Sequence, residues 1–215
     1  MIGALLILGL AAGLQSAPVS IKAGEPAMLR SWYASARCLV RADGKGAERL
    51  LSVRPQSMEF FTAFLKADTG PRCFDQRSQA KQPLHENATR GAIAEALLLR
   101  DFSALGVARG RHFATVFEPL APSPKPMNGE ARAIAFLEVA ECTVEAQPEQ
   151  SFQLFATEVA SPAEAAVVRA LVPALGTCLP QGFQVPMSAP YIRSFLAEAA
   201  YRVSVRRLSP SARTR

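Results

Sequence analysis

Apolar positions recur at helical spacing along much of the chain. Trp32, Ala36, Leu39 and Val40 lie three to four residues apart, which places them on one face of a helix. Alanine, leucine, glutamate and arginine, all good helix formers, dominate the surrounding segments. The pattern therefore predicts a mostly α-helical protein, with helices over 27–41, 45–53, 58–66, 90–100, 130–145, 149–157, 162–175 and 189–201.

Hydroxyl side chains mark the expected starts of three of these helices. Ser57 precedes 58–66, and Ser161 precedes Pro162, which suits the first helical position. The side-chain oxygen of a serine or threonine at this point accepts a hydrogen bond from an N–H group of the first turn. Thr89 is expected to cap 90–100 in the same way. Short strands over 113–117 and 182–187 are left open.

The two halves of the chain resemble each other at a spacing of about 104 residues. When Cys38 is aligned with Cys142, an aromatic residue, an alanine and a valine around each cysteine also coincide. Further on, Arg90–Leu97 (RGAIAEAL) matches Arg193–Ala200 (RSFLAEAA). We therefore expect a tandem duplication that produces two homologous helical units.

Composition divides the chain into five segments. An apolar run over 2–14, followed by small residues, predicts a signal peptide over 1–17, with the mature chain starting between Leu14 and Pro18. The helical units are expected over 25–101 and 130–201, joined by a proline-rich connector over 102–129. Residues 202–215 contain five arginines and no acidic residue, and we expect a basic flexible tail there.

Export changes the interpretation of the four cysteines, because oxidising compartments permit disulfides. Four cysteines allow three pairings. The cysteine separations of 35 and 36 residues within the two units favour Cys38–Cys73 and Cys142–Cys178. Neither pair has the Cys-x-x-Cys spacing of a thioredoxin-like redox centre. We therefore expect one structural disulfide in each unit.

This duplicated pattern resembles a family of uncharacterised exported bacterial proteins. The resemblance rests on Cys38, Cys73 and 90–97, with a weaker match at Cys142, Cys178 and 193–200. It extends over residues 30–201. It implies a periplasmic or secreted location, and it implies no particular chemistry.

Charge and composition exclude several classes of function. The net charge of +6 comes from 24 basic and 18 acidic residues, and most of the excess lies in the expected tail. The body therefore lacks the basic face of a nucleic-acid-binding protein. His85 and His112 belong to no metal-binding motif, and neither a phosphate-binding glycine loop nor a Gly-x-Ser-x-Gly turn occurs. We expect no metal, cofactor or nucleic-acid partner and name no catalytic residue.

A repeated arginine–glutamate pair is the main polar feature. Arg90 and Glu95 recur as Arg193 and Glu198. Five residues on a helix correspond to a rotation of about 140°, so the two members of each pair point away from each other. Three alternatives remain: bridges between units (Arg90–Glu198 and Arg193–Glu95), a charged cleft for an anionic ligand, or solvated helix faces.

Bridges between units would also bring together the small residues of the two helices. Gly91, Ala92 and Ala94 lie on the first helix, and Ser194, Ala197 and Ala199 lie on the second. Small side chains allow two backbones to approach closely. We therefore expect these two helices to pack against each other about a pseudo-twofold axis.

The sequence favours an exported, non-enzymatic binding or scaffold module of the cell envelope, whose partner is an envelope component or another protein. It would not be transmembrane after signal removal. The alternative is an envelope hydrolase in which Glu95, Glu198 or His85 provides acid/base groups in a cleft between the units. Carboxylates that converge in an open pocket would favour the enzyme, whereas carboxylates paired with arginines inside an interface would favour the module.

Overall fold

The computed structural model describes residues 25–67, 73–74, 86–109, 117, 120, 129–183 and 188–208. Within these residues the protein is mostly α-helical, as the sequence predicts. The first half contains α1 (Glu25–Ala42), α2 (Gly44–Ser52), α3 (Met58–Ala67) and α5 (Glu86–Asp101). The second half contains α6 (Glu130–Ala146), α7 (Pro148–Ala156), α8 (Pro162–Cys178) and α9 (Ala189–Leu208).

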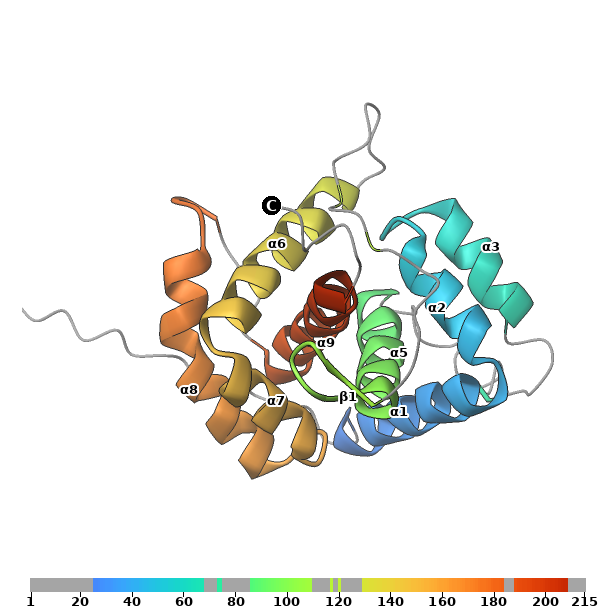
Figure 1. Ribbon diagram of the computed structural model, residues 1–215, viewed down its shortest axis with the longest axis horizontal. Helices are drawn as coiled ribbons and strands as arrows, with labels where there is room; N and C mark the ends of the chain where they lie inside the picture. Colours follow the sequence, from blue (N-terminus) through green and yellow to red (C-terminus); the bar gives the residue numbers. More distant parts are fainter. Residues whose placement is uncertain are drawn as a thin grey trace, which may run out of the picture.

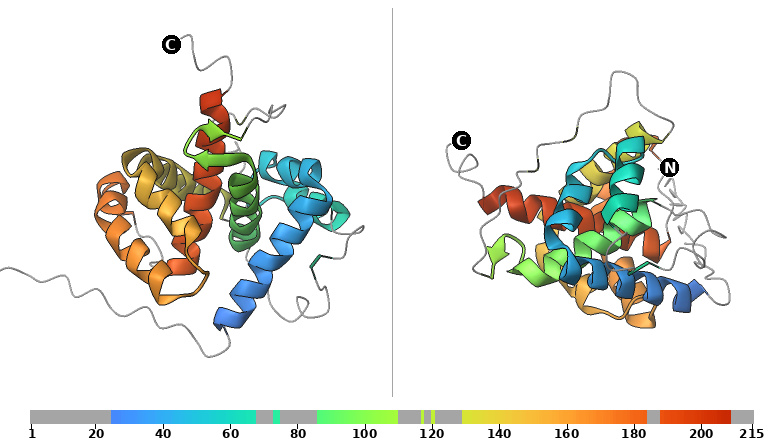
Figure 2. Two further views of the ribbon diagram at one scale, coloured as in Figure 1. Left: turned by 60° about the horizontal axis from the view of Figure 1, so that its bottom comes forward. Right: turned by 90° about the vertical axis from the view of Figure 1, so that its right-hand side faces the viewer.

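The helices α5 and α9 form the centre of the molecule, and the other helices surround them (Figure 1). On one side α1 and α2 pack against α5, and on the other α6, α7 and α8 pack against α9 (Figure 2). Apolar side chains of both central helices are fully buried, including Ile93, Leu97, Leu196 and Ala200. Burial of these residues from both halves produces one continuous hydrophobic core.

The same local signals begin α3 and α8. Ser57 Oγ accepts the N–H of Phe60 at 3.1 Å, and Ser161 Oγ accepts the N–H of Glu164 at 3.1 Å. Both predicted serine caps are therefore confirmed. The residues before them, Gln56 and Ala160, both have positive φ angles, 56° and 58°. A left-handed residue before each cap lets the chain turn sharply into the helix.

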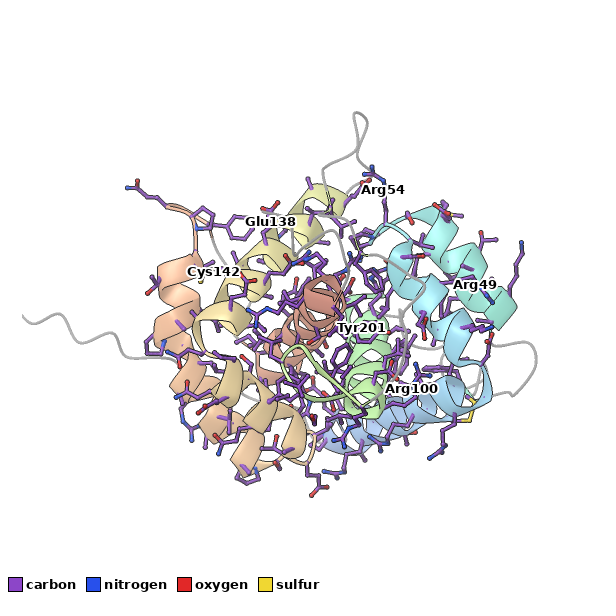
Figure 3. All side chains as sticks on the ribbon, viewed as in Figure 1. Arg49, Arg54, Arg100, Glu138, Cys142 and Tyr201 are labelled. Carbon is purple, nitrogen blue, oxygen red and sulfur yellow. A yellow bond between two sulfur atoms is a disulfide. The ribbon has the colours of Figure 1, made fainter. Side chains whose placement is uncertain are left out.

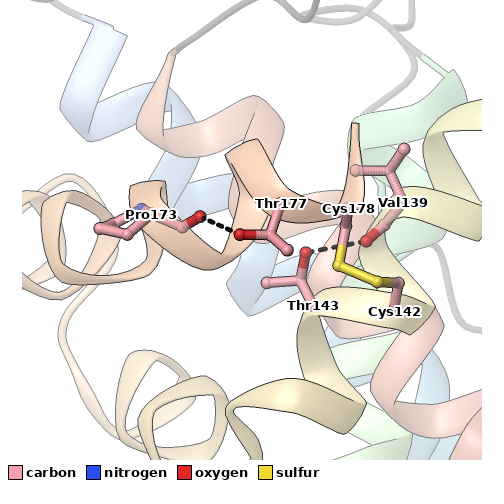
Figure 4. Close-up of a disulfide and its surroundings, with 6 residues drawn as sticks. All are labelled: Val139, Cys142, Thr143, Pro173, Thr177 and Cys178. Atoms are coloured by element: carbon pink, nitrogen blue, oxygen red, sulfur yellow. Dashed lines mark hydrogen bonds between the residues drawn. A yellow bond between two sulfur atoms is a disulfide. The ribbon is translucent and has the colours of Figure 1, made fainter. Parts of the chain in front are cut away.

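Both expected disulfides are present. Cys38 and Cys73 are joined with their Cα atoms 5.6 Å apart, and Cys142 and Cys178 with theirs 5.9 Å apart. The second bridge links α6 to the last residue of α8 (Figure 4). Each disulfide therefore closes a loop within one half of the chain and leaves the contact between halves to non-covalent packing.

Two expectations about helix ends are wrong. Thr89 does not cap its helix, because α5 already begins at Glu86 and Thr89 lies buried in its first turn. The tail does not begin at 202, because α9 continues to Leu208. Val203 and Val205 are buried there, and Arg202 pairs with Glu198 one turn earlier at 3.1 Å. These contacts supply the anchoring that a flexible tail lacks.

The connector also begins with regular structure. A hairpin of β1 (Phe102–Ala104) and β2 (Val107–Ala108) directly follows α5. Phe117, further along the connector, is buried against Tyr201 of α9, with ring centroids 5.6 Å apart. The signal peptide, both histidines and most of the two possible strands lie outside the described residues. None of the described helices is long and apolar enough to cross a membrane.

Candidate functional site

The repeated arginine–glutamate residues meet between the central helices. Arg90 donates to Glu198 through Nε at 3.0 Å and Nη2 at 2.6 Å. Arg193 donates to Glu95 through Nε and Nη2, both at 2.7 Å. All four side chains are at least 96% buried. The structure thus brings together the residues of both inter-unit pairs, and each pair is bidentate, the strongest geometry for arginine and carboxylate.

Each arginine also binds the end of a surrounding helix. Arg90 donates to the carbonyls of Leu50, Leu51 and Val53 at 3.0–3.1 Å, where α2 ends. Arg193 donates to the Thr157 carbonyl at 3.2 Å, where α7 ends. The last carbonyls of a helix have no partner within the helix, so buried ends require such donors. The two arginines therefore join a central helix to an outer helix in each half.

The two halves of this network differ in charge. Glu198 accepts from a second arginine, Arg202, at 3.1 Å, whereas Arg193 is shared between Glu95 and Glu164, the latter at 3.2 Å. The position in α3 that matches Glu164 is Phe60, and its ring lies 5.1 Å from the Arg90 guanidinium. One cluster therefore has two arginines for one carboxylate, and the other has two carboxylates for one arginine.

This difference shifts the pKa values of the matching carboxylates in opposite directions. Burial acts to raise the pKa of Glu198, but the charges of Arg90 and Arg202 outweigh it and the pKa is lowered. Burial raises the pKa of Glu95, and the contacts with Arg193 offset this only in part. Both carboxylates are enclosed between helices, where their role is to hold α5 and α9 together.

A separate pocket of about 540 Å³ lies on the side of the molecule where α3 and α6 face each other. Early residues of α3, α5, α6 and α9 contribute to its wall. Its aromatic lining consists of Phe60, Phe61, Phe64, Phe136 and Tyr191. Its remaining described lining consists of Gln56, Glu86, Asn87, Thr89, Gly129, Arg132 and Ala133. Among these residues, neither Glu95 nor Glu198 is present.

Hydrogen bonds within the first half and one ion pair between the two halves surround this pocket. The N–H of Gln56 donates to Glu86 at 2.5 Å, and Gln56 Nε2 donates to Asn87 Oδ1 at 3.3 Å. Arg54, labelled in Figure 3, lies in the turn before α3. It pairs with Glu130 at the start of α6 at 3.0 Å. Burial raises the pKa of Glu86, and the Gln56 N–H opposes that shift.

Thr89 is the least satisfied polar group of the pocket wall. Its side chain is 1% exposed, and its Oγ1 has no hydrogen-bond partner within the described part of the chain. A buried hydroxyl without a partner is destabilising unless something supplies the hydrogen bond. The matching position in α9 is Ile192, which is also buried. The helical frame therefore does not itself require a hydroxyl at this position.

The sequence prediction missed this pocket, although comparison of the two halves contains a signal for it. Four polar residues of the first half line the pocket: Gln56, Glu86, Asn87 and Thr89. The residues at the matching positions of the second half are Ala160, Ala189, Pro190 and Ile192. Polar residues therefore occur in only one of two equivalent places. This difference between the halves indicates that helix packing does not require the polar residues of the pocket.

Comparison with protein-family models, curated proteins and solved structures gives no match to this chain. The described residues also contain no group of three or more side chains suited to holding a metal ion. The candidate site is therefore the pocket, and its chemistry has to be inferred from its own lining.

Proposed function

We propose that the protein is an exported, non-enzymatic binding module of the bacterial cell envelope, built from two duplicated helical units. In this proposal it belongs with the exported proteins that its duplicated cysteine and helix pattern resembles. Its ligand site is the pocket between α3, α5, α6 and α9. One observation carries the proposal: the matching carboxylates are engaged by arginines in the interface, while an open pocket with other lining residues lies elsewhere.

The two disulfides support export, since such bonds persist in oxidising compartments. The apolar run over 2–14 supports the same location. Duplication is supported by features that recur at matching positions: the disulfides, the serine caps of α3 and α8, and the arginines that bind helix ends.

The geometry of the carboxylates favours binding over hydrolysis. A glycosidase needs one carboxyl group that can give up or take a proton beside its substrate. Glu95 and Glu198 are both held by two hydrogen bonds from an arginine and are buried between helices. Aromatic rings and hydrogen-bonding groups around a concave space are typical of ligand sites.

Binding of the uncharged dye N-phenylnaphthylamine to the full oxidised chain tests this proposal. The dye should fluoresce when it enters the pocket, and Phe61→Ser should weaken its binding at least fivefold. Phe61 suits this purpose because it lines the pocket yet is 46% exposed, so its replacement leaves the fold intact. Leu99→Ser, at a comparably exposed apolar residue of α5 outside the described pocket lining, is the control. Equal loss in both variants, or no binding to the wild type, would contradict the proposal.

A further inference from the structure

We infer that the pocket binds a small organic cation, with a primary ammonium group beside Glu86 and an apolar body among the phenylalanine rings. This inference rests on the proposed binding function and adds the chemical class of the ligand. It follows from three properties of the wall: a carboxylate without a counter-charge, hydrogen-bond acceptors without donors, and an aromatic lining.

Glu86 is the acidic side chain of the described pocket lining. Its Oε1 accepts the Gln56 N–H at 2.5 Å. Within the described part of the chain, its Oε2 accepts no hydrogen bond and its carboxylate forms no ion pair. The charges that act on it belong to Arg90 and Glu198, which pair with each other and have opposite effects. Burial raises the pKa of Glu86, because no cation offsets the cost of its charge, and a bound ammonium group would do so.

The helical frame does not require this carboxylate. The residue of α9 that matches Glu86 is Ala189, and the first turn of α9 contains no acidic residue. The residue that matches Gln56 is Ala160, and both residues have nearly the same positive φ angle. The turn and the helix start therefore form without these polar side chains, which occur only where the pocket lies.

The polar end of the pocket offers acceptors to a ligand. The amide Nε2 of Gln56 donates to Asn87 Oδ1 at 3.3 Å, and the side chain of Asn87 also bonds Tyr191. By contrast, Glu86 Oε2 and Gln56 Oε1 accept no hydrogen bond from any residue that the structure describes. An ammonium group has three donors and no acceptor, whereas a carboxylate has only acceptors. The ammonium group is therefore the better match.

The aromatic lining also favours positive over negative charge. The face of an aromatic ring carries partial negative charge and attracts cations. Two lining rings already lie close to arginines of the chain: the Phe136 ring centre is 5.4 Å from the Arg132 guanidinium, and the Phe60 ring centre is 5.1 Å from that of Arg90. An anion among these rings would gain no such attraction.

Arg132 is the basic side chain of the described lining, and it does not neutralise Glu86. Burial raises the pKa of Tyr191, and the charge of Arg132 opposes that rise. Arg132 is not among the charges that shift the pKa of Glu86. Arg132 therefore acts on the α9 side of the pocket, and an ammonium group beside Glu86 does not have to lie against it.

The size of the cavity limits the body of the ligand. About 540 Å³ falls within the range of small-molecule sites. Phe60, Phe64 and Phe136 are each 3% exposed and form apolar walls, while Phe61 is partly exposed. A single aromatic ring on a short chain suits such a space, whereas a sugar would leave these rings without apolar partners.

Calorimetric titration of the full oxidised chain with matched ligands tests the inference. Phenylpropylamine, phenylpropanol and phenylpropionate share one body and differ in the head group, and the amine is charged at about pH 8. We expect one amine per chain, bound about tenfold more tightly than the alcohol, as a charged hydrogen bond contributes. The acid should bind most weakly, because its carboxylate would face that of Glu86.

Two glutamate variants provide the site-specific test. Glu86→Gln keeps the shape of the side chain and an oxygen that can accept the Gln56 N–H. It should weaken amine binding about tenfold and leave binding of the alcohol and of the uncharged dye unchanged. Glu59→Gln is the matched control, because it removes the same charge from an exposed residue of α3 outside the described lining. It should bind the amine like the wild type.

A measurement on the wild type does not depend on how Glu86→Gln folds. Glu86 takes up a proton as the pH falls, so the preference for the amine over the alcohol should shrink between about pH 8 and pH 4. The alcohol serves as the reference, because any general loss of structure at acid pH weakens both ligands. A preference that does not change with pH would contradict the contact with Glu86.

The outcomes separate the ligand class from the binding function. If the alcohol or the acid binds as tightly as the amine, the pocket remains a binding site and the inferred ligand class is wrong. If Glu86→Gln binds the amine like the wild type, or if Glu59→Gln weakens it equally, the assigned position of the ammonium group is wrong. If neither the amine nor the uncharged dye binds, both this inference and the proposed function are overturned.

Discussion

Gly91 of α5 and Ser194 of α9 occupy matching positions in the two halves and touch each other at the centre of the molecule. A Cβ atom on Gly91 would lie 2.3 Å from the Cα atom of Ser194 and 2.6 Å from its carbonyl oxygen. The neighbouring small residues are buried as well: Ala92, Ala94, Ala197 and Ala199. The expected approach of the two helices through small residues is therefore present at this contact.

Gly91→Ala should destabilise the protein by about 3 kcal/mol or more, because the added methyl group meets backbone atoms that cannot rotate away. Urea unfolding monitored by circular dichroism measures the change. Gly176→Ala is the control, since Gly176 lies in α8 with no described atom within 4 Å of an added Cβ. That variant should stabilise the protein by about 0.5–1 kcal/mol, as alanine does in a helix. Similar effects at both positions would contradict the close contact.

The Arg193–Glu95 pair should be strongly coupled in a double-mutant cycle. Arg193→Ala leaves Glu95 and Glu164 buried without their arginine and should cost about 3–5 kcal/mol in the free energy of unfolding, whereas Glu95→Ala leaves Arg193 paired with Glu164 and should cost less. The second substitution should cost much less once the first is present. Urea melts of the four proteins give the coupling energy directly.

The exposed pair Arg30–Glu158 is the control for this cycle. Its charged groups are 3.6 Å apart, and its side chains are 45% and 69% exposed. Pairs of this kind contribute under about 1 kcal/mol. A coupling energy near zero for Arg193 and Glu95 would mean that these residues do not hold the central helices together.

The order and type of the helices could be predicted because periodic apolar positions and helix-forming residues determine them locally. The disulfides could be predicted because a repeated spacing reduces three pairings to one. The extent of α9 could not, since 202–208 has few apolar residues and its burial depends on Glu198 and Leu51, the latter far away in the chain. Local composition therefore indicated a tail where tertiary contacts produce a helix.

The pocket was beyond sequence prediction for a similar reason. Threonine is a residue type that often caps helices. Only the structure shows that α5 begins before Thr89, at Glu86. Its unpaired hydroxyl becomes visible only when the surroundings from α3, α6 and α9 are known. Comparison of the two halves could have indicated the site, because Thr89 and Ile192 differ in polarity at matching positions.

The second disulfide should contribute about 4 kcal/mol to stability in the chain-entropy account of loop closure. Replacing both Cys142 and Cys178 with serine should lower the free energy of unfolding by roughly that amount, and urea melts measure it. The Cys38–Cys73 bridge should remain intact in this variant, and peptide mapping without reductant checks this. A map of the wild type that joins Cys38 to Cys142 or Cys178 would contradict the pairing.

The mature chain should begin between Leu14 and Pro18, a region outside the described residues. The short apolar run over 2–14 and the small residues after it are the basis of this prediction. Intact mass of protein released from the periplasm or the medium should show loss of the first 13 to 17 residues. Recovery of the full-length chain from the cytosol, with its cysteines reduced, would count against export.

Glu95 and Glu198 should affect stability with opposite dependence on pH. The pKa of Glu198 is lowered in the folded protein, so its contribution is present above the unfolded pKa of about 4.3 and is lost as the pH falls through the folded pKa. The pKa of Glu95 is raised, so its contribution is present below about pH 4.3 and is lost as the pH rises through the folded pKa.

Urea melts of Glu95→Gln and Glu198→Gln between about pH 7 and pH 3 test these signs, because the remaining titrating groups are common to all three proteins and cancel in the differences. The stability advantage of the wild type over Glu198→Gln should shrink on acidification below about pH 4.3. Its advantage over Glu95→Gln should instead grow as the pH falls toward that value. The physical reason is the unequal charge around the two carboxylates: Arg90 and Arg202 surround Glu198, whereas Glu95 competes with Glu164 for Arg193. Differences that move in the same direction would show that both clusters carry the same charge balance.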